Sequence, residues 1–121
     1  MNLYPEGTRI KPNKLAKAQE FAQQNGHALP QHVLIPRVRG FQATLDGLEG
    51  HLQAVYDLTI VYESAPPTIW ELLSGQGCRV KLDVKRFAIE QLPKDQEGRG
   101  AWLLELFRQK DQHIAQLKRQ F

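Results

Sequence analysis

Cysteine is nearly absent from this sequence of 121 residues, which contains only Cys78. A single thiol cannot form an intrachain disulfide or a cysteine-based metal cluster, so disulfide-stapled folds and zinc ribbons are excluded. No apolar run approaches the roughly 20 residues that a helix needs to cross a bilayer. The first residues, MNLYPEGTRIK, contain no apolar core of a signal peptide. We therefore expect no transmembrane segment and no secretion signal in this chain.

A strong charge imbalance is also missing. Sixteen Lys and Arg residues face thirteen Asp and Glu residues, which gives a formal net charge of +3. The basic residues form three loose groups, and acids interleave in the last two: Arg9, Lys11, Lys14 and Lys17; Arg79, Lys81, Lys85 and Arg86; Arg108, Lys110, Lys118 and Arg119. Nucleic-acid-binding proteins concentrate cations on one face, so we expect no nucleic-acid partner. A solvated basic surface, or mild attraction to anionic lipid headgroups, fits this pattern better.

The hydrophobic pattern predicts alternating helices and strands in one globular domain. Hydrophobic residues make up 41% and charged residues 24% of the sequence, and the length suits a single domain. The expected order is the tail of a strand at 1–4, a helix at 13–25, a strand at 32–38, a helix at 41–48, a strand at 53–62, a helix at 68–74, a strand at 78–89, a loop at 92–100 and a helix at 101–121. This alternation favours an α/β fold.

Two of these segments carry sharper signals. Thr68 and Glu71 have the spacing of a capping box, in which each side chain bonds to the other residue's backbone amide. From Cys78 to Lys85, apolar and charged residues alternate, so we expect a strand with Val80, Leu82 and Val84 facing the core and the charged residues in water.

The stretch Pro5-Glu6-Gly7-Thr8-Arg9 has the chemistry of a phosphate site. Gly7 permits a tight turn or the close approach of a ligand, Thr8 offers a hydroxyl, and Arg9 offers a planar fork of donors that matches phosphate oxygens. Glu6 can hold Arg9 in place. The alternative is an ordinary turn with a Glu–Arg surface pair, which contributes little energy.

The same residues carry a resemblance to a known family. Tyr4-Pro5-Glu6-Gly7-Thr8-Arg9 is similar to the F-P-E-G-T-R block of the glycerolipid acyltransferases, the superfamily that includes 1-acylglycerol-3-phosphate acyltransferase. Residues 32–37 (HVLIPR) resemble the later apolar-Pro block, and residues 55–62 the strand that follows. The branch with lysocardiolipin-type enzymes and their bacterial relatives has a C-terminal W-L…F…K-D…I…L helix, which is matched here by Trp102, Leu103, Phe107, Lys110, Asp111, Ile114 and Leu117.

That resemblance implies a fold and a function. Residues 1–121 would be a single partial domain, the C-terminal half of an acyltransferase α/β sheet domain. The complete protein would transfer a fatty acyl group from acyl-CoA or acyl carrier protein, as co-substrate, to a lysophospholipid at the cytoplasmic side of a membrane. No cofactor or metal is implied. Glu6, Gly7, Thr8 and Arg9 would bind the acceptor phosphate, and Ile35 with Pro36 would shape the acyl and acceptor pocket.

One part of the family pattern is not found. The family's catalytic base is a His followed five positions later by an Asp that orients it. Those positions after His27, His32, His51 and His113 hold His, Arg, Tyr and Lys. We therefore predict no catalytic residue here and no turnover by this chain alone, and a half sheet with unpaired edges that invites self-association. The alternative function is that of a truncated family member, a non-catalytic remnant that binds an anion or a lipid.

Two further candidates for a functional site are a pair of histidines and one aspartate. His27 and His32 flank Pro30, but no third ligand for a metal stands nearby in the sequence. Asp57 lies within an apolar strand, where a structural pairing with a cation and a functional role are both open.

Overall fold

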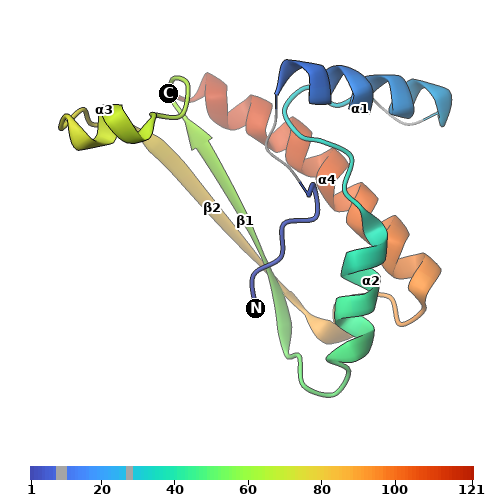
Figure 1. Cartoon of the computed structure of the whole chain (residues 1–121). Coiled ribbons are helices and arrows are strands. Elements are labelled where there is room, and N and C mark those ends of the chain that lie inside the picture. Colours follow the sequence, from blue (N-terminus) through green and yellow to red (C-terminus); the bar gives the residue numbers. More distant parts are fainter. Residues whose placement is uncertain (8–10, 27–28) are drawn as a thin grey trace.

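The computed structural model describes residues 1–7, 11–26 and 29–121, and combines four α-helices with one two-stranded sheet (Figure 1). In chain order the elements are α1 (Pro12–Gln24), α2 (Val38–Gly47), β1 (Ala54–Tyr62), α3 (Ile69–Leu73), β2 (Val80–Ala88), a 3-10 turn (Ile89–Gln91) and α4 (Gln96–Arg119). This mixture confirms the α/β class that the alternating pattern predicts.

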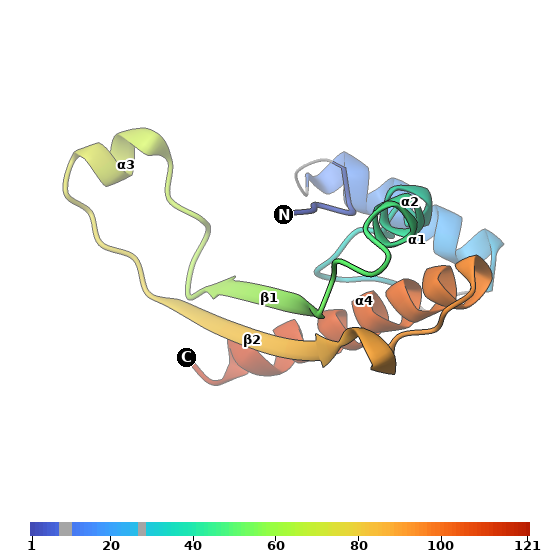
Figure 2. The same cartoon turned by 90° about the horizontal axis from the view of Figure 1, so that it is seen from below.

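The sheet is an antiparallel hairpin. β1 and β2 pair along nine residues each, from Ala54 opposite Ala88 to Tyr62 opposite Val80. α4 runs along one face of this hairpin, while α3 stands at the far end of the connection between the strands (Figure 2). Because an isolated hairpin is at best marginally stable, α4 is the support that keeps the sheet in place.

The core lies where α2, α4 and the base of the hairpin meet. Its buried members are Val33, Phe41, Leu45, Leu92, Leu103 and Phe107. Trp102 joins the layers, since its ring stacks on Phe41 with centroids 5.7 Å apart and meets Phe87 edge-on at 5.2 Å. α2 approaches α4 closely at buried Gly100, where an added Cβ would lie 2.9 Å from the Gln42 side-chain nitrogen.

The helix predictions are confirmed in most respects. Thr68 and Glu71 form the capping box of α3, with each backbone amide bonded to the other side chain. α4 exists, but it begins five residues earlier than predicted, inside the expected loop. The reason is Asp95, whose carboxylate accepts a hydrogen bond from the Gly98 amide at 2.8 Å and caps the helix there.

The predicted strand at 32–38 is wrong, and so is the strand tail at 1–4. Residues 31–33 bend around the carboxylate of Asp111 on α4, because the amides of Gln31, His32 and Val33 all donate to its Oδ1 atom. Amides that point at one oxygen cannot pair with a neighbouring strand. Residues 1–4 lead instead into a turn.

The predicted orientation of the second strand is also wrong. Val80, Leu82 and Val84 are 48%, 60% and 51% exposed, whereas Lys81 and Asp83 turn toward α4. The residues that share a face were predicted correctly, but the buried face is the polar one. His113 of α4 is hydrogen-bonded to Asp83 on this face at 3.0 Å, and Lys110 of α4 forms an ion pair with Asp57 of the neighbouring strand at 2.5 Å.

We predict that Asp111→Ala lowers the free energy of unfolding by about 2 kcal/mol, because three amides lose a charged acceptor. Urea denaturation followed by circular dichroism measures this change. Asp46→Ala, which removes an exposed carboxylate from α2, is the control and should stay within about 0.5 kcal/mol of the unmodified chain. Equal losses in both variants would contradict a clamping role for Asp111.

We also predict that Lys110→Met costs about 3 kcal/mol, because it leaves the Asp57 carboxylate uncompensated. The side chains of Lys110 and Asp57 are only 12% and 10% exposed, so solvent does not compensate for the loss. Lys118→Met, an exposed change on the same helix, should be nearly neutral. The double variant Asp57→Leu with Lys110→Met should recover most of the loss in the same denaturation experiment. A double variant as unstable as the single one would argue against this account.

Candidate functional site

Pro5–Gly7, the described part of the PEGTR block, lies beside the end of the HVLIPR block, although 22 residues separate the two blocks in sequence. The amide of Arg37 donates to the carbonyl of Pro5 at 2.8 Å, which ties the end of the HVLIPR block to the start of the PEGTR block. The amide of Gly7 donates to the carbonyl of Tyr4 at 3.0 Å and closes a turn over Tyr4–Gly7. Proline second and glycine fourth is a favoured arrangement for such a turn.

Gly7 has a specific structural reason to be glycine. Its φ is +72°, a left-handed conformation that side chains disfavour. A Cβ at this position would also lie 3.4 Å from the Cζ and Nε atoms of Arg37. The turn therefore permits the Arg37 guanidinium to lie directly against the backbone of the PEGTR block.

The turn and the start of α2 enclose a hollow of about 530 Å³, which we call the motif hollow; it is lined by Leu3, Tyr4, Pro5, Gly7, Arg37, Val38, Arg39, Gly40 and Phe41. Arg37 and Arg39 are exposed there, and half-buried Glu6 lies within the adjoining turn. A guanidinium fork beside a concave surface is suited to binding a phosphate or carboxylate.

The four residues predicted to bind phosphate divide into two groups. Glu6 and Gly7 lie in the turn beside the motif hollow. Thr8 and Arg9 lie outside the described residues, so their part in the site stays a prediction. α1 begins at Pro12, a favoured first residue of a helix, shortly after them.

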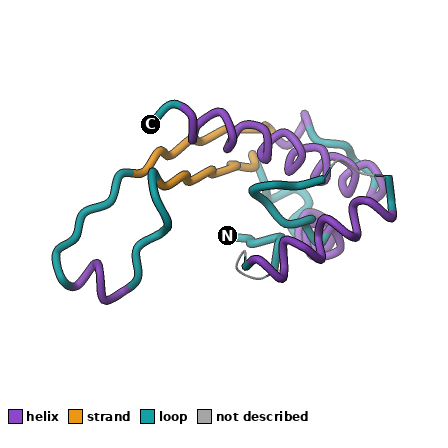
Figure 3. The backbone as a smooth tube through the Cα atoms, turned by 90° about the horizontal axis from the view of Figure 1, so that it is seen from above, coloured by secondary structure: helices purple, strands orange, loops and turns teal. Residues whose placement is uncertain are grey.

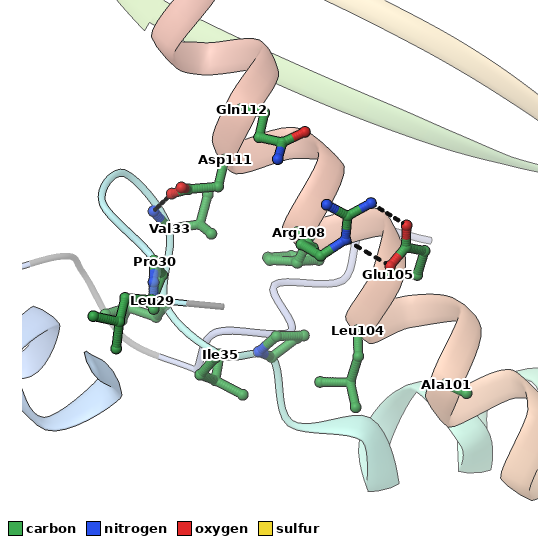
Figure 4. Close-up of a pocket in the computed structure, with 13 residues that line it drawn as sticks. Leu29, Pro30, Val33, Ile35, Ala101, Leu104, Glu105, Arg108, Asp111 and Gln112 are labelled. Carbon is green, nitrogen blue, oxygen red and sulfur yellow. Dashed lines mark hydrogen bonds and ion pairs between the residues drawn. The ribbon is translucent and has the colours of Figure 1, made fainter. Parts of the chain in front are cut away.

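A second concave surface lies between residues 29–36 and α4, and we call it the apolar groove (Figure 4). Its volume is about 460 Å³, and its lining is mostly apolar: Leu29, Pro30, Val33, Leu34, Ile35, Pro36, Ala101, Leu104 and Phe107, with Glu105, Arg108, Asp111 and Gln112 at the polar positions. Ile35 and Pro36, the two residues predicted to shape a pocket, both belong to this wall. Their contact with a ligand remains a prediction.

Polar contacts fix both walls of the apolar groove. Asp111 holds the 31–33 bend against α4, and Gln19 of α1 donates to the Pro30 carbonyl at 2.9 Å. On the α4 side, Arg108 donates to both carboxylate oxygens of Glu105. These hydrogen bonds lower the pKa of Glu105 and raise the pKa of Arg108.

The groove and the hollow follow one another along the chain. Pro36 lines the apolar groove, and the next residue, Arg37, lines the motif hollow. One short segment thus presents an apolar surface and then a cation. The motif hollow, too, is lined mainly by uncharged side chains, with Arg37 and Arg39 as its cations.

The other predicted candidates have different surroundings. Asp57 pairs with Lys110, which supports the structural alternative for this residue. His27 lies outside the described residues, and within the described ones no group of three or more His, Cys, Asp or Glu side chains is arranged to hold a metal. In the same part of the chain, no helix combines the length and apolarity needed to cross a membrane.

Sequence reasoning missed two contributors. Arg37 is the last residue of the HVLIPR block. Its position directly after Pro36, a predicted pocket residue, is the signal in the sequence that could have indicated it. Leu104 lies beside the predicted apolar stripe of α4, and its exposure to the groove depends on where the 29–36 segment packs. That packing is a long-range contact, which local periodicity does not contain.

Comparison with known proteins agrees with the resemblance that the sequence motifs indicate. Residues 71–120 match the family described as Acyltransferase C-terminus. The chain is 36% identical over 121 residues to 1-acyl-sn-glycerol-3-phosphate acyltransferase 3 of Arabidopsis thaliana, covering 98% of this chain and 31% of that protein. It is 36% identical to 1-acyl-sn-glycerol-3-phosphate acyltransferase epsilon of Mus musculus, covering 90% and 33%, and 37% identical to lysocardiolipin acyltransferase 1 of Danio rerio, covering 93% and 30%.

No solved structure gave a significant match. The chain spans about a third of the length of these curated relatives. The similarity covers at least nine tenths of the chain in all three, and the 98% coverage by the Arabidopsis protein includes the PEGTR block, the HVLIPR block and nearly all of α4. These matches place the chain in the glycerolipid acyltransferase family, as a relative of the C-terminal portion of 1-acyl-sn-glycerol-3-phosphate and lysocardiolipin acyltransferases.

Proposed function

We propose that the complete protein transfers a fatty acyl group from an acyl-CoA or acyl carrier protein thioester to the hydroxyl of a lysophospholipid of the 1-acylglycerol-3-phosphate type. This chain would supply the acceptor-binding part. The observation that carries the proposal is the sequence step from Pro36, which lines the apolar groove, to Arg37, which lines the motif hollow. The relatives, whose names specify acyl transfer to such lipids, support it.

In this proposal the acceptor phosphate binds in the motif hollow. Arg37 donates hydrogen bonds to it, together with Arg9 and the Thr8 hydroxyl of the PEGTR block, while Glu6 orients the cations. Gly7 contributes by its small size, since its amide is already bonded to Tyr4. Ile35 and Pro36 face the acyl chain in the apolar groove. Two arginines on one phosphate neutralise its charge and fix its orientation.

The chemical step requires a base. The acceptor oxygen attacks the thioester carbonyl, a carbon–oxygen bond forms and the carbon–sulfur bond breaks. The hydroxyl proton passes to a base, and the thiolate leaves and is protonated to a thiol. None of the four histidines of this chain has an Asp five positions later. We therefore assign proton removal to a His-Asp pair outside these residues, and propose binding without turnover for the chain.

The same absence of a His-Asp pair favours a second candidate, a remnant that binds an anionic lipid without transferring an acyl group. The DNA upstream of the Met1 codon discriminates between the two. A reading frame that continues into a His-x4-Asp motif supports the enzyme, and an in-frame stop codon close by supports the remnant.

We further propose that the complete protein works at the cytoplasmic side of a membrane, where its acceptor resides. For the isolated chain we propose self-association through the hairpin. Within the described residues, β1 and β2 pair only with each other, so both outer edges of the sheet keep unpaired backbone groups. The half-exposed apolar face of the sheet adds to this tendency.

We predict that Arg37→Ala and Arg9→Ala each weaken binding of a short-chain lysophosphatidate to this chain by roughly tenfold or more, since each removes a charged hydrogen bond. Titration calorimetry below the lipid's micellar concentration measures the affinity. Arg86→Ala, an exposed change on β2, is the matched control and should leave the affinity unaltered. A monoacylglycerol without phosphate should bind all four proteins equally weakly. Unchanged affinity in Arg37→Ala would remove that residue from the site.

We predict that this chain, mixed with lysophosphatidate and acyl-CoA, forms no phosphatidate above the uncatalysed rate. Mass spectrometry of the lipid product is the suitable measurement, because the exposed thiol of Cys78 would react with thiol reagents. Catalysed product would mean that a residue of this chain acts as the base. The binding titration is run on the same sample. It shows that the absence of product does not result from a failure to bind the acceptor.

A further inference from the structure

The connection between the two strands forms an arm that stands away from the rest of the molecule (Figures 2 and 3). Its neck is closed by Glu63 and Arg79, whose backbones are hydrogen-bonded at 3.0 Å and whose side chains form an ion pair at 3.2 Å. Beyond the neck, residues 64–78 include a single charged residue, Glu71. α3 lies within this stretch.

α3 carries large apolar side chains that are exposed to solvent. Trp70 and Leu73 are 79% and 74% exposed, and Ile69 and Leu72 are exposed beside them. We call these four residues the arm tip. A soluble surface rarely gathers four large apolar residues within five positions without a partner for them.

The backbone of the arm tip is prepared for an apolar environment. The Glu71 carboxylate and the Thr68 hydroxyl accept hydrogen bonds from each other's amides, and Ser74 donates its hydroxyl to the Glu71 carbonyl. The amides of Leu72, Ser74 and Gly75 are bonded within the same turn. Transfer of this segment out of water therefore leaves few unpaired polar groups.

Cations gather at the base of the arm. The ring of Phe121 lies 4.7 Å from the Lys81 ammonium and 6.0 Å from the Arg79 guanidinium, which brings the last turn of α4 beside the neck. That turn carries exposed Lys118 and Arg119. Arg79 and Lys81 at the base and Lys118 and Arg119 on the adjoining turn of α4 make four basal cations, of which Arg79 is paired with Glu63.

We propose that the arm tip inserts into the headgroup–acyl boundary of an anionic bilayer, with the four basal cations on the headgroups. A tryptophan with aliphatic neighbours, followed by Lys and Arg residues, is the pattern of an interfacial anchor. The tip protrudes, and its one charged side chain, Glu71, is engaged in the capping box, so it suits a flat surface with anionic headgroups for the basal cations. A second copy of this chain would have to offer a cleft for it. The contact lies apart from the motif hollow and does not require acyl transfer.

The test uses this chain and vesicles of phosphatidylcholine, with or without one third phosphatidylglycerol, and with no lysolipid or thioester. We expect cosedimentation with the anionic vesicles. Trp70→Ser with Leu73→Ser should weaken it at least tenfold, because two apolar anchors are lost. Phe21→Ser, which removes a half-exposed apolar residue from α1, is the matched control and should bind normally. Lys118→Gln and Arg119→Gln should each cost about fivefold.

Fluorescence makes the test independent of the folding of the tip variant. In a Trp102→Phe chain, Trp70 is the single reporter, and its emission should shift to the blue on anionic vesicles. In a Trp70→Phe chain, the core residue Trp102 should show no shift. Three results would overturn the proposal: no vesicle binding, binding without a shift of Trp70, or self-association that the tip variant abolishes in sedimentation while vesicle binding persists. None of these depends on whether the complete protein is an acyltransferase.

Discussion

Two consecutive charged residues on α4, Lys110 and Asp111, attach two separate parts of the structure to this helix: the sheet and the bend at residues 31–33. Neighbouring helix residues point about 100° apart, so one turn of α4 reaches in two directions. Lys110 extends to Asp57 and the Leu58 carbonyl in the sheet. Asp111 extends to the three amides of the 31–33 bend. Both contacts are shielded from solvent in part, where electrostatic interactions are stronger than on an open surface. The sheet and the groove wall therefore share one helical support.

The candidate site depends on the second of these contacts. Asp111 fixes residues 31–33, and the chain then continues through Ile35 and Pro36 to Arg37, which bonds to Pro5. The position of Arg37 beside Gly7 is thus determined by a carboxylate on another helix. The three sequence blocks that resemble acyltransferase motifs are thus linked in the structure: the start of the PEGTR block provides the turn, the HVLIPR block the groove wall and the arginine, and the K-D pair of α4 the anchor.

Local signals in the sequence predicted most elements. The period of Leu103, Phe107 and Ile114 was enough for α4, and the Thr68–Glu71 spacing for the start of α3. The strand predicted at 32–38 failed because its amides bind Asp111, 79 residues away from His32, and no local pattern contains such a partner. The second strand failed differently. Alternation shows that Val80, Leu82 and Val84 share a face, but which face points outward depends on the long-range packing of the opposite face against α4 and the core. Arg37 was missed because it lies beside Gly7 in the folded chain but far from it in the sequence.

The outward apolar face of the hairpin has a mechanical consequence. The inner face of the sheet combines polar and apolar side chains: Asp57 and Asp83 contact α4, while Thr59 and Val61 are buried at 4% and 2% exposure. The nine-residue pairing of β1 with β2 runs from this packed base out to the arm. If the arm tip lies in a bilayer, the hairpin therefore connects that contact to α4, the helix that also holds the wall of the apolar groove through Asp111.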